Sequence, residues 1–352
     1  MECFVHNAFI GRVIFGIDTI KKIPDELGRL SCNRALIIST PQQQDHAEML
    51  REVLGESAAA IFCGAAMHTP VEVTAAAMQV AKEKRIDCLI AIGGGSTTGL
   101  SKAIAYRTDL PQIVVATTYA GSEMTPILGQ TEDGIKTTLK DQKVLPEVVI
   151  YDVRLTLTLP PDISGTSGIN AIAHAVEALY AEDKNPSTSS MAEQGIVYLA
   201  RALPIIASHP QNMDARSDAL AGAALCGQCL ADVGMALHHK LCHTLGGLYG
   251  LPHAATHTAV LPHATAYNAE ADPTAMQTIG RALDSDSAPT GLYDLGHAVN
   301  AKMGLHELGL AESDLDRAAD LAVQNPYWNP RPIDRKALRD LLQRAWAGDP
   351  PA

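Results

Sequence analysis

The sequence predicts an α/β domain with a mostly parallel sheet in residues 1–160, followed by an all-α domain in residues 161–352. Three observations predict this division. Short β-branched runs alternate with helical segments in the first part, as in a parallel sheet covered by helices. Strand-like runs largely vanish in the second part, where long segments carry apolar residues at helical spacing. A chain of 352 residues is also too long for one ordinary core.

Individual segments justify each half of this prediction. Strands rich in apolar or β-branched residues are expected at residues 34–40, 59–64, 87–92, 112–118 and 147–152. Helices are expected between them at residues 41–55 and 70–85, and the second begins at a proline and ends in cations. Helical periodicity in the second half covers residues 169–181, 187–207, 214–250 and 334–348.

The composition excludes several classes of partner. A net charge of −12 gives an acidic surface that repels nucleic acid and anionic lipid, so we expect neither. No segment approaches the roughly 18–20 apolar residues of a membrane span, and the N-terminus shows no signal peptide. The seven scattered cysteines indicate reduced thiols and a cytoplasmic location. Cys226 and Cys229 form a C-x-x-C pair inside a helical run, which favours packed cysteines over a redox motif.

A glycine loop follows the strand expected at residues 87–92. Glycines without a Cβ let backbone N–H groups approach a phosphate, and the N-terminus of the next helix adds free N–H groups and a positive dipole end. The expected phosphate-binding residues are Gly93, Gly94, Gly95, Ser96 and Thr97. The alternative is a tight strand-to-helix turn that binds nothing.

A second loop with hydroxyl side chains follows the strand expected at residues 112–118. Thr117, Thr118 and Ser122 would lie at the carboxyl end of a parallel strand, where open α/β sheets bind dinucleotides. Thr40 ends the first expected strand, at the position where an acid often binds the ribose of NAD and excludes a 2′-phosphate. Because this position is neutral here, the sequence is compatible with either NADH or NADPH.

Six of the thirteen histidines lie within residues 238–263. His239 and His243 are four residues apart in a helical segment and therefore share a face, as do Asn170 and His174. His253 follows a glycine-rich turn, so two helices and a turn can direct several imidazoles into one cavity. We expect His257 and His263 to make structural hydrogen bonds, and His238 to face away from His239 because it lies about 100° around the helix.

The segments "GGGSTTGLSKAIA", "NAIAHAVEAL" and "HHKLCHTLGGLYGLPHA" together resemble the iron-containing alcohol dehydrogenase family over nearly the whole chain. The resemblance implies the dehydroquinate synthase-like fold of that family, a nicotinamide dinucleotide at the glycine loop and a homodimer. Ordinary members hold a metal with one aspartate and three histidines. The matching positions here are Asn170, His174, His239 and His253, and His243 matches a histidine beside the nicotinamide.

Two departures from the family pattern weaken the metal site. Asn170 stands at the aspartate position, and a neutral amide is a poor partner for iron or zinc. Gly99 stands where the glycine loop of typical members carries a second aspartate. The sequence therefore favours a metal-independent enzyme. The alternatives are a metal-dependent alcohol dehydrogenase, a metal-storage protein without catalysis, and a lyase on the related scaffold.

Within the family, the segments "TTYAGSEMTPILGQTEDGIKTTLKD" and "NPYWNPRPI" resemble members that reduce the C=C bond of 2-maleylacetate, a small dicarboxylate, to 3-oxoadipate with NADH or NADPH. For that chemistry we expect His243 to donate a proton or stabilise an enolate, and His174, His239 and His253 to bind substrate oxygens. The resemblance also implies Lys143 near the cofactor, with a solvated surface lysine as the alternative. Tyr327 and Arg331 are candidate substrate-binding residues, with a rigid C-terminal loop as the alternative.

Overall fold

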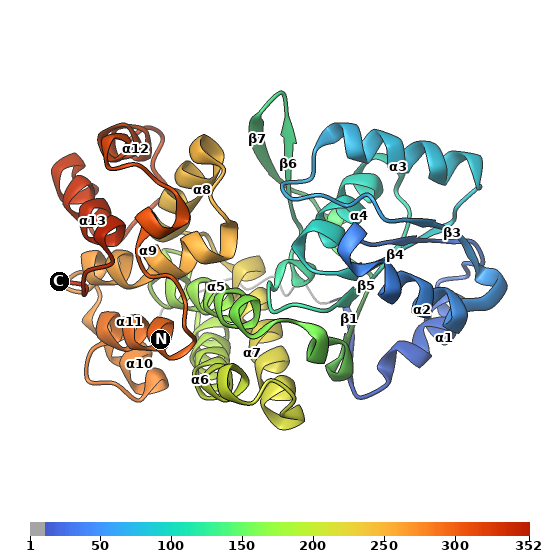
Figure 1. The fold of residues 1–352 in the computed structure, drawn as a ribbon, viewed down its shortest axis with the longest axis horizontal. Helices are drawn as coiled ribbons and strands as arrows, with labels where there is room; N and C mark the ends of the chain where they lie inside the picture. Colours follow the sequence, from blue (N-terminus) through green and yellow to red (C-terminus); the bar gives the residue numbers. More distant parts are fainter. Residues whose placement is uncertain (1–10) are drawn as a thin grey trace. The chain divides into compact units, whose positions relative to one another are not determined.

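The computed structural model describes residues 11–352, apart from the side chains of residues 135 and 136. Cys3 and the segment examined for a signal peptide therefore lie outside the described residues. The described chain divides between Leu159 and Pro160 into two compact units, here called the N-terminal unit and the C-terminal unit. Each unit is built around its own layers, as the predicted α/β and all-α patterns require (Figure 1).

A six-stranded parallel sheet forms the centre of the N-terminal unit (Figure 1). Its strand order is β1-β8-β5-β4-β2-β3, and every pair in it is parallel. The strands are β1 (Arg12–Gly16), β2 (Ala35–Ile38), β3 (Ala58–Phe62), β4 (Cys88–Gly93), β5 (Gln112–Ala116) and β8 (Val148–Asp152). The five predicted strands are confirmed, and β1 is an edge strand that the apolar pattern did not identify.

Both faces of the sheet are covered, which explains why its strands read as continuous apolar runs. Ile37 and its neighbours on one face pack against α1 (Ile23–Arg29) and α2 (Gln44–Leu54). Leu36 and Ile38 on the other face pack against α3 (Val71–Glu83) and α4 (Gly95–Thr108). A separate antiparallel hairpin, β6 (Ile127–Glu132) and β7 (Ile135–Lys140), was not predicted.

Helices alone build the C-terminal unit in the residues that the structure describes, which confirms the predicted all-α class (Figure 1). They are α5 (Pro161–Tyr180), α6 (Pro186–Ser208), α7 (Met213–Asp232), α8 (Leu237–Tyr249), α9 (His253–Asn268), α10 (Pro273–Leu283), α11 (Ala288–Ala298), α12 (Leu315–Ala322) and α13 (Arg335–Ala347). Helices α5, α8 and α9 carry the clustered histidines.

The segment at residues 214–250, which has a single helical pattern in the sequence, is broken in the structure. Helices α7 and α8 meet at an angle of 95°, and Val233 between them is extended. No single helix within residues 11–352 is long and apolar enough to cross a membrane, and α7 with α8 passes that test only as this bent pair. Cys226 and Cys229 are buried in α7, where burial raises the pKa of both thiols, as expected for packed cysteines.

Candidate active site

Three helices of the C-terminal unit bring the predicted histidines together. Ring centroids of His174 on α5 and His239 on α8 are 5.1 Å apart, and those of His239 and His243 are 5.9 Å apart. The His253 and His257 rings on α9 are 4.2 Å apart, and the His257 ring is 5.0 Å from that of His239. The predicted shared face of His239 and His243 is therefore confirmed, and the imidazoles form one cluster.

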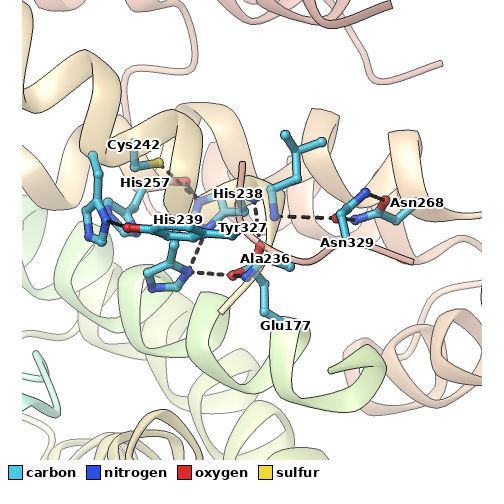
Figure 2. A network of polar contacts seen from close by, with 11 residues as sticks. Glu177, Ala236, His238, His239, Cys242, His257, Asn268, Tyr327 and Asn329 are labelled. Carbon is cyan, nitrogen blue, oxygen red and sulfur yellow. Dashed lines mark hydrogen bonds and ion pairs between the residues drawn. The ribbon is translucent and has the colours of Figure 1, made fainter. Parts of the chain in front are cut away.

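Glu177, which sequence reasoning missed, holds the start of α8 and orients His239 (Figure 2). It lies on the same face of α5 as Asn170 and His174 and is fully buried. Its carboxylate accepts hydrogen bonds from the backbone N–H groups of Ala236 and His238, both at 2.7 Å, and from Nδ1 of His239 at 2.8 Å. Because Nδ1 of His239 is used in this way, Nε2 is the ring atom left for a ligand.

Several buried polar atoms of the cluster have no hydrogen-bond partner among the described residues. They are Oδ1 of Asn170, Nδ1 of His174, Nε2 of His239 and both ring nitrogens of His257. Burial and then the neighbouring histidines lower the pKa of His174 and of His257 well below its usual value, so both are neutral at pH 7. Unsatisfied buried polar atoms are rare in folded proteins, so their concentration here indicates a site that binds a polar ligand.

Two predictions about the histidine run are wrong. His238 does not face away from the cluster, because its ring lies 5.1 Å from that of His239 and its Nε2 donates to the backbone oxygen of His257 at 3.0 Å. The ring of His257 makes no structural hydrogen bond within the described chain, since both its nitrogens lack a partner. Helix α9 packs against α8 and encloses His238, which helical spacing within α8 alone does not reveal.

The half-exposed part of the cluster contains Tyr327 but not Arg331. The hydroxyl of Tyr327 lies 3.0 Å from Nδ1 of His243. Arg331 instead donates a hydrogen bond to the backbone oxygen of Tyr267 at 3.0 Å and lies 4.2 Å over the ring of that tyrosine. The structure thus places Tyr327 with the histidines. Arg331 makes contacts that stabilise the C-terminal loop, as the alternative interpretation of this segment predicts.

The glycine loop of the N-terminal unit leaves the sheet between β4 and α4. Gly93 has a φ of +149°, and a Cβ there would lie 2.6 Å from Oε1 of Gln43. A Cβ on Gly94 would lie 2.8 Å from the side chain of Thr118, so both positions require glycine. Helix α4 has no side-chain cap, and Gly95 is open, so the first N–H groups of the helix remain available to an anion.

Neighbouring loops complete this cradle at the carboxyl ends of β2, β4 and β5. Gln43 donates to Oγ1 of Thr117 at 2.9 Å and accepts from Oγ1 of Thr40 at 3.4 Å, so it connects the end of β2 to the loop that follows β5. Oγ of Ser122 is buried with no hydrogen-bond partner in residues 11–352, and it lies 4.0 Å from the Cβ position of Gly95. Strand order reverses between β2 and β4, which is the crevice where open α/β sheets bind dinucleotides.

The Gly99 position is closed by Thr69. A Cβ built on Gly99 would collide with Oγ1 of Thr69. A side chain at position 99 would therefore require the Thr69 hydroxyl to move.

Lys102 is a further residue that sequence reasoning missed. It lies on α4, is buried, and its ammonium donates to the backbone oxygens of Ser122, Thr125 and Ile127 at 2.7, 2.6 and 2.9 Å. Burial lowers the pKa of Lys102 to about 7, and the buried carboxylate of Glu123 opposes that shift. Lys102 therefore ties the loop that carries Ser122 to the helix that begins at the glycine loop.

The structure separates Lys143 from the other predicted cofactor residues. Its ammonium lies 3.4 Å from the carboxylate of Asp109, which caps the C-terminal end of α4. The glycine loop is at the opposite end of that helix of 14 residues, about 20 Å away at 1.5 Å per residue. We therefore correct the prediction and leave Lys143 out of the candidate cofactor site.

The histidine cluster differs from the metal site that the family resemblance implies at the position of the carboxylate ligand. Asn170 contributes a neutral oxygen in place of a carboxylate. Within the described residues, the imidazole nitrogens that lie within 4.8 Å of one another belong to His238, His239 and His257, which share only His239 with the implied ligand set. Glu177, the carboxylate that is bonded to His238 and His239 in the described part of the chain, is already engaged by three N–H donors. We therefore derive no catalytic step through a metal.

Comparisons with known proteins identify the family of this chain. The profile described as "Iron-containing alcohol dehydrogenase" matches residues 11–153, and that of the "Fe-containing alcohol dehydrogenase family, C-terminal" matches residues 164–346. The chain is 53% identical to the maleylacetate reductase of Rhizobium sp. (strain MTP-10005), covering 100% of both chains, and 53% identical to that of Sphingobium indicum, covering 99% of both. The crystal structure of maleylacetate reductase from Agrobacterium tumefaciens is 52% identical, with a TM-score of 0.96 and full coverage of both chains.

These likenesses, together with the dinucleotide-type sheet, define the protein as an oxidoreductase. The identity of about one half also extends over the full length of the chain. The chain belongs to the iron-containing alcohol dehydrogenase family.

Proposed function

We propose that this enzyme reduces the C=C bond of 2-maleylacetate to 3-oxoadipate with NADH or NADPH, without a metal, in the degradation of aromatic compounds. The observation that carries the proposal is a set of buried polar atoms without partners among the described residues, namely Oδ1 of Asn170, Nδ1 of His174, Nε2 of His239 and both ring nitrogens of His257. Burial keeps His174 and His257 neutral by lowering the pKa of each. The maleylacetate reductases that are about half identical to this chain support the choice of substrate.

The chemistry of the substrate explains why a metal is dispensable. The alkene of 2-maleylacetate is already activated by the neighbouring ketone, so no Lewis acid has to polarise an isolated carbonyl. Hydride from the nicotinamide adds to the alkene carbon beside the carboxylate, and the electron pair moves onto the ketone oxygen as an enolate. A proton then adds to the other alkene carbon, which restores the ketone and yields 3-oxoadipate and NAD(P)⁺. The protein must supply hydrogen bonds to the enolate oxygen and one proton.

Each unit contributes one part of this reaction. In the N-terminal unit, the glycine loop and Ser122 bind the dinucleotide phosphates, and the neutral Thr40 admits NADH or NADPH. In the C-terminal unit, Nε2 of His239 and the amide of Asn170 face the substrate oxygens, with His174 and His253 beside them. His243, paired with the hydroxyl of Tyr327, is the proposed proton donor. We also propose a cytoplasmic homodimer, as the family resemblance implies.

The group formed by His238, His239 and His257 favours one second candidate, a metal-dependent alcohol dehydrogenase acting on a small alcohol or aldehyde. Zinc sites with three histidines do occur, and such a site would keep an open position for substrate. This candidate predicts bound metal in the purified protein.

Removal of metal separates the two candidates. Protein purified without chelator is expected to oxidise NADH in the presence of 2-maleylacetate, and incubation with EDTA is expected to change the rate by less than about twofold, because no step depends on a metal ion. The measurements are absorbance at the NADH band and elemental analysis of the same sample. Stoichiometric iron or zinc combined with loss of activity in EDTA would support the alcohol dehydrogenase instead.

Replacement of His243 tests its proposed role as proton donor. We expect His243→Ala to lower kcat about 100-fold, the usual contribution of general acid catalysis, while the Kd for NADH changes by less than about threefold. Steady-state kinetics and NADH fluorescence titration provide the two values. His209→Ala, an exposed histidine at the end of α6, is the matched control and should behave as wild type. A His243→Ala enzyme with near-normal kcat would remove His243 from the mechanism.

A further inference from the structure

Lys240 occupies the half-exposed side of the histidine cluster. It lies on α8 between His239 and His243 and is only partly buried. Its ammonium lies 5.8 Å from the centroid of the Tyr327 ring. The hydroxyl of the same tyrosine is 3.0 Å from Nδ1 of His243. A cation, a phenol and an imidazole thus surround one end of the cluster, and we call Lys240, Tyr327 and His243 its rim.

The positive charge of Lys240 has no counterion within the residues that the structure describes. Its ammonium makes neither an ion pair nor a hydrogen bond there, in contrast to Arg331, which is held by Tyr267. The carboxylate of the cluster, Glu177, is fully buried and already accepts hydrogen bonds from Ala236, His238 and His239. Contact with an aromatic ring positions an ammonium group but leaves its charge uncompensated.

This charge stands out against an acidic protein. With a net charge of −12, the chain as a whole repels a dianion, so a dicarboxylate requires local positive charge where it binds. At the buried end of the cluster, Asn170 and His239 offer polar atoms without partners, suited to a ketone oxygen. At the rim, Lys240 offers an uncompensated cation, suited to a carboxylate.

We infer that Lys240 binds one carboxylate of the dicarboxylate substrate and makes the enzyme selective for dianions over monoanions. The inference rests on the proposed function, because it assumes that 2-maleylacetate binds with its enone at the buried end of the cluster and one carboxylate at the rim. Lys240 is a binding residue in this arrangement and takes no part in hydride or proton transfer.

Kinetics of three variants test this inference. Lys240→Met removes the charge and keeps the length of the side chain, and we expect the KM for 2-maleylacetate to rise about 10- to 100-fold with kcat within about threefold of wild type. Lys240→Arg should recover most of the loss. Lys336→Met, an exposed lysine on α13, is the matched control and should leave KM unchanged. The Kd for NADH should stay the same in all three, which a general structural disturbance would not predict.

Two monomethyl esters of 2-maleylacetate identify the charge that Lys240 recognises. For wild type, kcat/KM should be at least about 10-fold lower with one of the esters than with the dianion. Lys240→Met should use this ester and the dianion equally well, because the ammonium that binds the carboxylate is already absent. If Lys240→Met lowers kcat/KM by the same factor for the dianion and for both esters, the inference is overturned.

Binding of adipate, a six-carbon dicarboxylate that cannot be reduced, tests the contact without turnover. Calorimetry should show binding to wild type and binding at least about 10-fold weaker to Lys240→Met. If 2-maleylacetate is not reduced but adipate binds in this Lys240-dependent manner, the proposed function fails and the inference about Lys240 stands. Equal adipate affinity in both proteins, or none in wild type, overturns the inference itself.

Discussion

Replacing Glu177 with alanine is expected to lower the free energy of unfolding by about 3–5 kcal/mol, the usual cost of removing one partner from a buried charged network. The substitution leaves the N–H groups of Ala236 and His238 and Nδ1 of His239 without their acceptor inside the protein. It also frees the His239 ring to rotate, so we expect kcat to fall at least about 100-fold even where the protein remains folded. Urea unfolding and steady-state kinetics measure the two effects.

Two further variants sharpen this test. Glu177→Gln keeps the size of the side chain and one acceptor oxygen, so its loss of stability should be smaller, but its amide cannot serve all three donors. Glu182→Ala removes an exposed acid two residues after the end of α5 and should be within about 0.5 kcal/mol of wild type. A Glu177→Ala protein as stable and active as this control would show that α8 and His239 do not depend on Glu177.

Replacing Lys102 with methionine should produce the second large effect, on cofactor binding. Methionine fills a similar volume but cannot donate to the backbone oxygens of Ser122, Thr125 and Ile127. We expect a loss of about 2–4 kcal/mol in the free energy of unfolding from the unsatisfied acceptors. We also expect the Kd for NADH to rise about 10-fold or more, because the loop carrying Ser122 is no longer held against α4.

The measurements for Lys102→Met are urea unfolding and NADH fluorescence titration. Lys82→Met, an exposed lysine on α3 of the same unit, is the control and should match wild type in both. The sharper readout is cofactor affinity at low urea, where both variants are folded. Wild-type affinity for NADH in Lys102→Met would mean that the Ser122 loop does not take part in cofactor binding.

Features determined by local sequence could be predicted. The strand around Ile90 is predictable because both sheet faces are buried, which makes the whole strand apolar. The glycine loop is predictable because Gly93 and Gly94 follow a strand and precede a helix. The proximity of His239 and His243 follows from helical spacing alone.

Features determined by distant contacts could not be predicted in the same way. Glu177 acts on N–H groups about sixty positions later, so its partners cannot be predicted from its own helix, although helical spacing places it on the face of Asn170 and His174. The ammonium of Lys102 donates its hydrogen bonds to backbone oxygens. Every residue type has a backbone oxygen, so the sequence carries no sign of these partners. His238 illustrates the limit of helical spacing, because α9 covers the side of α8 on which it lies. Lys143 was assigned by motif similarity, but it pairs at the far end of α4.

The contact between Gly99 and Thr69 has a consequence for the engineering of this enzyme. An aspartate at position 99 would drive its first side-chain carbon into the Thr69 hydroxyl, so that hydroxyl has to move before an acid fits there. Replacing Thr69 with alanine would remove the colliding atom. An attempt to place acids at positions 99 and 170 of this protein therefore begins with a substitution at a third position, residue 69.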